Sequence, residues 1–491
     1  MRLWIGLHLP LLPLEVFAPS WSIDTGSVVL ERERVLLASP SALDAGVHAG
    51  MRRGGVVMLL PDARVHVRAP ALEADALQAV ALTLLQYTPQ VTDGEEATLL
   101  LDVGASLRLF GGVRALCRRV HASVRALGFT ASLACAPTAR GAWLMARANA
   151  GRVVQVESLL RRLDRLAVAL MPASRPFADW LDGIACRTLG DLRRLPRPGL
   201  QRRCGRALLD QLDAAYGLTV ELFTWISPPE TFRARLELYD RIDDAELLLA
   251  GAQCLLAQLT GWLCARQLAV ERIVLQLEHE RGRVARAPTC VDVVLAEPTW
   301  RDEHLVRLLR ERLGRLALEA PVIGLALEAM QVRPMAPPNA SLFPEPGGSD
   351  DNRMRMLELL AARLGPENVL QPLPLADYRS DQANVWVPVQ QKVSDKARNA
   401  QLPPDVTSLP RPTWLLPSPI ALLMRGHYPF YGTPLRLASS AERIEAGWWD
   451  GPEARDYFIA EGQDHALYWV YRERIGTGED GPRWFLHGLF G

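Results

Sequence analysis

Acidic side chains around one short stretch are the best candidates for chemistry. Glu95 and Glu96 precede an apolar run, Leu99 to Val103, and Asp102 lies inside it. Clustered carboxylates can hold Mg²⁺ ions, which template an in-line attack on a phosphate and neutralise the charge that develops there. The chemistry to test is therefore metal-assisted phosphoryl transfer, with Asp24 as a further candidate ligand.

The apolar run predicts a buried strand followed by a loop, because it is short and glycines follow it. The whole stretch, EEATLLLDVGASLRLFGG, resembles the palm strand of Y-family (translesion) DNA polymerases. The family pattern there is S-x-D-E-A-(F/Y)-L-D-(V/L), followed by an L-F-G-type turn. If Asp102 takes the Asp of the closing Leu-Asp-Val step, the family's metal-binding Asp-Glu pair falls on Ala97 and Thr98.

The first predicted strand, Leu3 to Leu9, lacks its carboxylate as well. The family's opening metal-ligand Asp falls on Gly6 when Glu15 is set on a family Glu. His8 is the only titratable group in this strand, and a lone His in an apolar strand is expected to be a core residue. The resemblance implies no catalytic residue, no bound metal and no cofactor, with degenerate positions at Gly6, Ala97 and Thr98.

An active translesion polymerase with a displaced metal site is the alternative. It would use Asp102, Glu95, Glu96 or Asp24 as ligands. Side chains alternate along a strand, so a shift of one or two residues is a large geometrical error. A Glu at a strand edge is expected to be solvated. The sequence therefore favours a protein that is not an enzyme.

The segment LDAGVHAGM resembles the polymerase fingers, with matches at Gly46, Gly50 and Met51. The family's triphosphate-binding Tyr and Arg fall on Pro40 and Leu43, so the groups that would bind a triphosphate are missing as well.

A basic segment follows the predicted palm. LDGIACRTLGDL resembles a helix-hairpin-helix module, which presents backbone N–H groups to phosphates. One acid, Asp191, lies among seven arginines. Such a charge run is usually a solvated face, but its coincidence with this motif favours DNA binding. The predicted DNA-binding residues are Gly183, Arg187, Arg193, Arg194, Arg197, Arg202, Arg203 and Arg206.

A Pro/Gly-rich linker carries a short motif similar to the sliding-clamp-binding peptide Q-x-(S/D)-L-F. Its residues are Asn339, Ala340, Ser341, Leu342 and Phe343. Two apolar side chains in a linker have no core to join, so a pocket on a partner would accommodate them. A shorter amide replaces the usual Gln at Asn339.

The last block is aromatic-rich and resembles the C-terminal domain of ImuB-type proteins, through GWWD, RDYF and WFLHGLF. Three segments, RDYFIAEG, HALYWVYRER and RWFLHGLFG, predict a β-meander. No nucleophile or metal spacing accompanies the polar residues there, so a small β-domain with an aromatic core is favoured over a catalytic cluster. These polar residues are Asp450, Arg455, Asp456 and His487.

The order of elements predicts an α+β multidomain fold. Residues 231–333 read as strand, helix, strand, strand, helix, strand, a split βαβ sheet similar to the polymerase little finger. The predicted divisions are a palm and fingers (1–165), a helix-hairpin-helix thumb (166–228), a little finger (229–334), a linker with the clamp peptide (335–350), a partly flexible connector (351–412) and a β-rich C-terminal domain (413–491).

Composition limits the function classes. The 491 residues are 49% hydrophobic, with 55 basic and 55 acidic side chains, so overall charge selects no partner. Pro10, Pro13 and Glu15 interrupt the N-terminus where a signal peptide needs an apolar core, and a cytoplasmic location is expected. The seven cysteines have no C-x-x-C spacing, which argues against a disulfide framework and a zinc site.

The resemblance covers nearly the whole chain, and the sequence is identified as a member of the ImuB-type, Y-family polymerase-like group related to UmuC and DinB. This resemblance implies an inactive scaffold of a mutasome in the SOS response to DNA damage. The partners it implies are DNA, the β sliding clamp, a RecA-like accessory protein and an error-prone C-family DNA polymerase.

Overall fold

The computed structural model describes residues 2–280, 286–318, 320–335, 350–375, 377–389, 410–446, 453–474 and 483–490. The chain divides into two compact units, Met1–Arg363 and Leu364–Gly491. Each unit has its own hydrophobic clusters, and no cluster among the described residues contains side chains from both units.

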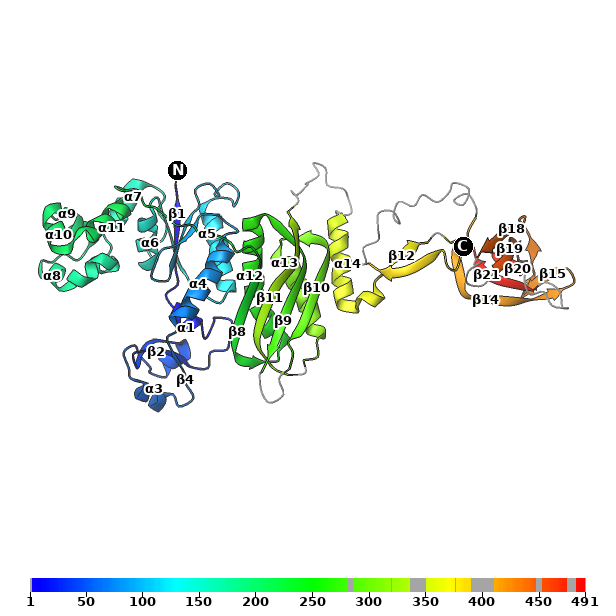
Figure 1. Ribbon diagram of the computed structural model, residues 1–491, viewed down its shortest axis with the longest axis horizontal. Coiled ribbons are helices and arrows are strands. Elements are labelled where there is room, and N and C mark those ends of the chain that lie inside the picture. The colour runs from blue at the N-terminus through cyan, green and yellow to red at the C-terminus, as the bar shows by residue number, and fades with distance from the viewer. Residues whose placement is uncertain are drawn as a thin grey trace. The chain divides into compact units, whose positions relative to one another are not determined.

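The palm-like sheet contains the first strand of the chain at its centre. The strand order is β5-β6-β1-β7, with β1 (Trp4–His8) antiparallel to both neighbours. The other strands are β5 (Val91–Asp93), β6 (Thr98–Asp102) and β7 (Ser132–Ala136). Leu99 and Leu101 face the helices α4 (Pro70–Leu84) and α5 (Val113–Ala126), while Leu100 belongs to a second cluster with α6 (Ala139–Arg147). The two faces of the sheet are therefore covered by different helices (Figure 1).

The fingers-like region forms a separate small sheet, β3-β2-β4, with its own cluster around Val28 and Val56. Its strand β2 pairs with β3 in a hairpin and with β4 in parallel. The elements of this region and of the chain before it are α1 (Leu12–Glu15), β2 (Ser27–Glu31), β3 (Arg34–Ala38), α2 (Pro40–Asp44), α3 (Arg53–Leu59) and β4 (Arg64–Val67).

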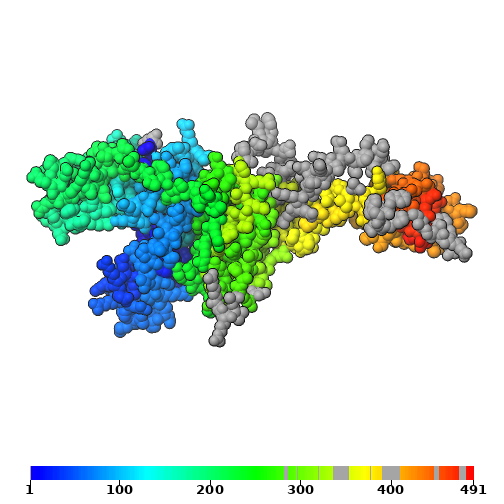
Figure 2. All heavy atoms as spheres, in the orientation of Figure 1, coloured from blue at the N-terminus to red at the C-terminus, as the bar shows by residue number. Residues whose placement is uncertain are grey.

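The thumb-like region is helical, and its helices share one apolar cluster with α6. Figure 2 shows α8 to α11 as a continuous group of atoms, coloured teal to green. The elements are α7 (Val156–Leu163), the 3₁₀ turns η1 (Val168–Leu170) and η2 (Pro172–Phe177), α8 (Ala178–Gly183), α9 (Leu189–Arg194), α10 (Arg197–Cys204) and α11 (Arg206–Tyr216).

The little-finger-like region has the predicted order of elements. Its antiparallel sheet runs β10-β9-β11-β8, so β11 separates β8 from β9 and splits that βαβ unit. The elements are β8 (Arg233–Ile242), α12 (Ala245–Arg266), β9 (Leu268–His279), β10 (Thr289–Thr299), α13 (Asp302–Arg315) and β11 (Val322–Pro334).

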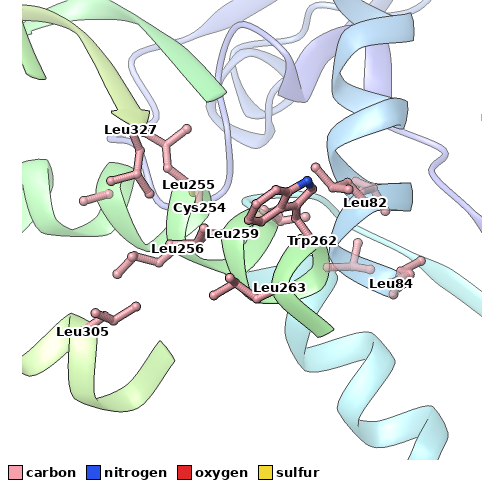
Figure 3. Packing of buried hydrophobic residues seen from close by; sticks show 14 of the residues in the cluster. Leu82, Leu84, Cys254, Leu255, Leu256, Leu259, Trp262, Leu263, Leu305 and Leu327 are labelled. Atoms are coloured by element: carbon pink, nitrogen blue, oxygen red, sulfur yellow. The ribbon is translucent and has the colours of Figure 1, made fainter. Parts of the chain in front are cut away.

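Helix α12 joins this sheet to the palm-like region. Its side chains Leu255, Leu259 and Trp262 lie between α4, α13 and β11 (Figure 3). A Cβ at Gly261 would lie only 2.7 Å from Thr83 Cα, so α12 and α4 meet backbone to backbone. By length and composition α12 is also the one helix in the described chain apolar enough to cross a membrane, but 72% of that window is buried, as in a core helix.

Helix α14 (Asp350–Leu364) lies on the first unit. His304 Nε2 on α13 pairs with the Glu358 carboxylate on α14, and both side chains are buried. Arg315 donates to the backbone oxygen of Ala362 over 3.3 Å. The described chain therefore returns to the little-finger-like region after residue 349.

The second unit is β-rich. The predicted meander is present as β19-β20-β21, and it continues into an eight-stranded sheet of order β16-β15-β14-β21-β20-β19-β17, with β18 paired to β19. The elements are η3 (Pro366–Asn368), β12 (Leu370–Pro374), β13 (Asn384–Pro388), β14 (Trp414–Arg425), β15 (Tyr428–Tyr431), β16 (Thr433–Pro434), β17 (Arg436–Leu437), β18 (Glu442–Ala446), β19 (Glu453–Glu461), β20 (Leu467–Glu473) and β21 (Trp484–Leu489).

The α+β fold class with a β-rich C-terminal region is confirmed. The six-part division of the chain stays a prediction. The structure itself divides the chain once, after Arg363.

Candidate functional site

Gly6, to which the sequence assigns the family's first metal-binding Asp, is closed in by backbone. Gly6 lies in the middle of β1, opposite Leu100 on β6 and Ala134 on β7. A Cβ at Gly6 would overlap the carbonyl oxygen of Ala142 and lie 2.6 Å from its carbonyl carbon. Helix α6 therefore packs directly on the strand, and no side chain of any kind fits here.

Thr98, to which the sequence assigns the Glu of the family's metal-binding pair, lies on the same face of the sheet as Gly6. Thr98 opens β6 directly opposite His8, and side chains of directly opposed residues share a face. His8 Nδ1 lies 3.1 Å from Thr98 Oγ1, which also donates to the Glu96 carbonyl over 3.1 Å. This polar pair is satisfied within the chain itself.

Ala97, to which the sequence assigns the Asp of that pair, lies in a strained turn. Glu95, Glu96 and Ala97 have φ values of 68°, 48° and 53°, all in the left-handed region. Each such residue without glycine's freedom costs about 1 kcal/mol. The turn is stabilised by its contacts: Leu9 N donates to Ala97 O over 2.9 Å, and Gly94 N donates to Thr98 O over 2.7 Å.

Two guanidinium groups bind the carboxylate of Glu96, and we call Glu96, Arg147 and Arg175 the arginine clasp. Arg147 on α6 lies 3.0 Å from Glu96 Oε2, and its Nη1 donates to the Glu96 carbonyl over 3.0 Å. Arg175 on η2 donates to both carboxylate oxygens, over 2.6 and 2.9 Å. The clasp connects the turn between β5 and β6 to α6 and to η2 of the thumb-like region.

The charges of the clasp set the protonation of its neighbours. The hydrogen bond from Arg175 and the charges of both arginines lower the pKa of Glu96, so this carboxylate stays ionised. Burial, then the charge of Arg147, lowers the pKa of His8 and keeps it neutral. Glu96 thus has two guanidinium partners, whereas a Mg²⁺ site uses carboxylate oxygens that bind the ion.

Sequence reasoning missed both arginines of the clasp. Arg140, Trp143 and Arg147 lie on one face of α6, at helical spacing, and both guanidinium groups stack on the Trp143 ring, with their centres 5.1 and 4.8 Å from its centroid. Trp143 is completely buried. The helical spacing was the sequence signal that could have placed Arg147 beside Trp143. No pattern in the sequence around Arg175 indicates that it pairs with Glu96.

The other carboxylates of the alternative reading have local structural roles. Asp102 accepts from Gly104 N over 3.1 Å at the far end of β6. Asp24 accepts from Gly26 N, from Ser39 Oγ and from both the backbone and hydroxyl of Ser41, at the start of α2. Partial burial raises the pKa of Asp24, but together these hydrogen bonds outweigh that effect and lower the pKa to about 2. Within the described ranges, no group of three or more His, Cys, Asp or Glu side chains could hold a metal ion.

The predicted DNA-binding arginines fall into two groups. Arg193 donates to Asp164 over 2.9 Å, and Arg197 donates to Asp213 through two nitrogens, over 2.9 and 2.5 Å, so both hold the thumb-like helices together. All seven arginines are exposed, but the other five have no ion pair as short as these. Arg187, Arg194 and Arg206 have partners at 4.0, 3.5 and 3.6 Å, and Arg203 stacks on Trp180, whereas for Arg202 the described chain shows no partner.

The predicted helix-hairpin-helix is formed by α8 and α9. Gly183 ends α8, and the turn includes Ala185 with a φ of 57°. Thr188 caps α9: its hydroxyl accepts from Asp191 N over 3.1 Å, and the Asp191 carboxylate accepts from Thr188 N over 3.1 Å. The one acid in the basic run is therefore part of a helix cap.

Two further predictions lie wholly or partly outside the described residues. The clamp-binding peptide, Asn339 to Phe343, is outside them, and so is Asp450. In the second unit, the buried Asp456 accepts from Arg443, Arg472 and Arg474 over 3.0, 2.9 and 3.2 Å. His487 lies 2.9 Å from the Tyr457 hydroxyl inside the aromatic core, where Trp469 stacks on both rings.

Comparison with known proteins gives one family match and two relatives. Residues 23–147 match the impB/mucB/samB family. The chain is 27% identical over 470 residues to Protein ImuB of Caulobacter vibrioides strain NA1000 / CB15N, covering 91% of this chain and 100% of the relative. Protein ImuB of strain ATCC 19089 / CIP 103742 / CB 15 matches equally. The expected resemblance to ImuB-type proteins is confirmed.

Two solved structures are similar at lower identity. A Dbh ternary complex is 18% identical, with a TM-score of 0.37, covering 66% of this chain and 98% of that one. DinB from Sulfolobus solfataricus is 16% identical, with a TM-score of 0.37, covering 68% and 100%.

Proposed function

We propose that this chain, which is similar to ImuB over nine-tenths of its length, is a non-catalytic scaffold of translesion DNA synthesis. It would act in the SOS response, in the cytoplasm, as part of a mutasome. Its partners would be damaged or primer-template DNA, the β sliding clamp, a RecA-like accessory protein and an error-prone C-family DNA polymerase.

The closed Gly6 position is the observation that carries the non-catalytic role. Nucleotidyl transfer needs carboxylates that hold Mg²⁺ against a triphosphate. The backbone of Ala142 occupies the space of one such carboxylate, and the neutral Thr98 stands at another. Glu96, two residues before Thr98, is already paired with both arginines of the clasp.

The thumb-like region supports the DNA-binding part of the proposal. Arg202 and Arg203 are exposed in the last turn of α10 and form no ion pair within the described chain, so both charges are available to phosphates. Backbone N–H groups and phosphate contacts of this kind bind a duplex without reading its sequence. A scaffold recruited to many lesions needs that property.

Several weak interactions joined in one chain can make a strong assembly. A flexible tether supplies an effective concentration of order millimolar and can raise avidity ~10²-fold or more. DNA, the clamp peptide and the C-terminal unit would provide three such interactions, and none of them requires a catalytic group.

Primer extension tests the proposal. The purified protein is given a primer on undamaged and abasic templates, with Mg²⁺ or Mn²⁺ and all four nucleotides. We expect no incorporation. Incorporation that disappears in Asp102→Ala, Glu95→Gln or Glu96→Gln would instead support the active polymerase with a displaced metal site.

Clamp pull-down separates the scaffold from a simpler DNA-binding protein. Deletion of residues Ser341 to Phe343 should abolish capture by the β clamp while leaving duplex affinity unchanged. Equal capture with and without the deletion would favour a repair protein with no clamp contact through this motif.

A further inference from the structure

Two cysteines from different elements meet beneath a surface pocket of the palm-like region. Cys117 lies on α5 and Cys135 on β7, and their sulfur atoms are 3.3 Å apart. All seven cysteines lie in the described part of the chain, and none forms a disulfide there. Among them, only Cys117 and Cys135 have sulfur atoms within hydrogen-bond distance of each other. The scaffold function proposed above makes no use of them.

Only one of the two cysteines lines the pocket. It has a volume of about 360 Å³ and is lined by Cys117, Arg118, His121, Leu133, Gly151 and Arg152. Cys135 is completely buried behind it. The entrance is therefore basic, and a small polar molecule that enters meets Cys117 first.

The two thiols differ in acidity. The contact with Cys135 and the nearby Arg152 charge lower the pKa of Cys117 despite its burial. The same contact and burial raise the pKa of Cys135. The thiolate is the reactive form of cysteine, so the accessible member of the pair is also the nucleophilic one.

We propose that Cys117 and Cys135 are a peroxide-oxidisable dithiol that closes to a disulfide between α5 and β7. The Cys117 thiolate attacks a peroxide oxygen: an S–O bond forms, the O–O bond breaks, and the released hydroxide takes up a proton to leave as water. Cys117 is oxidised to a sulfenic acid, and the peroxide is reduced.

The second step uses the neighbouring thiol. Cys135 sulfur attacks Cys117 sulfur, the S–S bond forms, the S–O bond breaks, and hydroxide leaves as water with the proton of Cys135. Two thiols and one peroxide thus give one disulfide and two waters. The sulfurs must approach by about 1.2 Å to reach bonding distance, and an external thiol reverses the reaction by exchange.

Peptide mass spectrometry on the full-length protein tests this. The reduced protein is exposed to graded hydrogen peroxide, free thiols are alkylated, and a tryptic digest is analysed without reduction. Residues 115–118 and 126–140 are the tryptic peptides that carry Cys117 and Cys135. We expect these two peptides to be linked, with loss of two hydrogens, at peroxide concentrations at least tenfold below those that oxidise the exposed Cys290.

Single substitutions assign the roles. In Cys135→Ser, Cys117 should accumulate as a sulfenic acid that a dimedone probe traps, and in Cys117→Ser Cys135 should stay reduced. Cys290→Ser is the matched control and should leave disulfide formation unchanged. Persistence of both buried thiols in the wild-type protein after Cys290 is fully oxidised would overturn the proposal, and this measurement needs no variant to fold.

Discussion

At the scale of single residues, the absence of one side chain decides how the palm-like sheet is packed. Gly6 lets α6 approach β1 so closely that the carbonyl of Ala142 takes the space of a side chain. The neighbouring charges follow from this approach, because Arg147 reaches Glu96 and His8 from that same helix. Gly6, which the sequence assigns to a metal-ligand position of the family, therefore contributes to packing in this chain.

Substitution of Gly6 by Ala should be strongly destabilising. The added Cβ must displace the α6 backbone, and overpacking of this kind costs about 1 to 3 kcal/mol or more. Urea unfolding of the full chain measures the change. Gly54→Ala is the matched control, since nothing lies within 4 Å of a Cβ added there, and it should be neutral or stabilising.

The arginine clasp should give Glu96 a pH-dependent contribution to stability. The pKa of Glu96 is lowered in the folded chain, so its contribution is fully present above its unfolded pKa of about 4.3 and is lost as pH falls through the lower folded value. Glu96→Gln should therefore reduce the free energy of unfolding at pH 7 by about 1 to 3 kcal/mol. The difference from wild type should shrink below about pH 4.

Glu95→Gln is the control for this measurement. Glu95 is exposed in the same left-handed turn and lies outside the clasp. It should leave both the stability and its pH dependence unchanged. A loss equal to that of Glu96→Gln would mean that the turn, and not the ion pairs, is what both substitutions disturb.

At the scale of elements, α10 carries one arginine that holds the thumb-like helices together and two that form no ion pair within the described chain. Arg197 opens the helix and is paired with Asp213, whereas Arg202 and Arg203 lie in its last turn and form no ion pair within the described chain. The Arg203 guanidinium lies over the Trp180 ring, 5.2 Å from its centroid, which positions it without neutralising it.

Replacing Arg202 and Arg203 together with Ala should weaken duplex binding and flatten its salt dependence. The slope of log affinity against log salt should fall by about 0.9 for each phosphate that the protein no longer neutralises. Fluorescence anisotropy at several salt concentrations measures it. The double substitution of Arg161 and Arg162, exposed on α7, is the control for removing two charges. An unchanged slope would mean that Arg202 and Arg203 do not contact phosphates and are only solvated surface residues.

The elements could be predicted from sequence because their signals are local. The apolar run Leu99 to Val103 predicted β6. The succession of strand and helix patterns predicted the order of elements in the little-finger-like region. The clasp could not be predicted, because Glu96 meets partners 51 and 79 residues away, and only the packing of α6 and η2 brings them together. Sequence also treated the seven thumb arginines alike, although two of them hold helices together.

At the scale of the whole molecule, two units have separate cores. Leu259 lies in the cluster that joins the palm-like and little-finger-like regions, and Leu486 lies in the small cluster of the second unit. Units without a shared core can unfold independently. Calorimetry of the full chain should therefore show more than one transition.

Core substitutions should assign these transitions. Leu259→Ala should cost about 2 to 5 kcal/mol and lower only the transition of the first unit, while Leu486→Ala should lower only that of the second. A shift of both transitions by either substitution would mean that the units are coupled.

The attachment of α14 has a mechanical consequence. The backbone N–H of Met335, just after β11, donates to Gln267 O, and α14 is held to α13 through Glu358 and His304. Met335 and α14 are thus both attached to the little-finger-like region. A force applied to Met335 or to α14 would therefore act directly on the little-finger-like region.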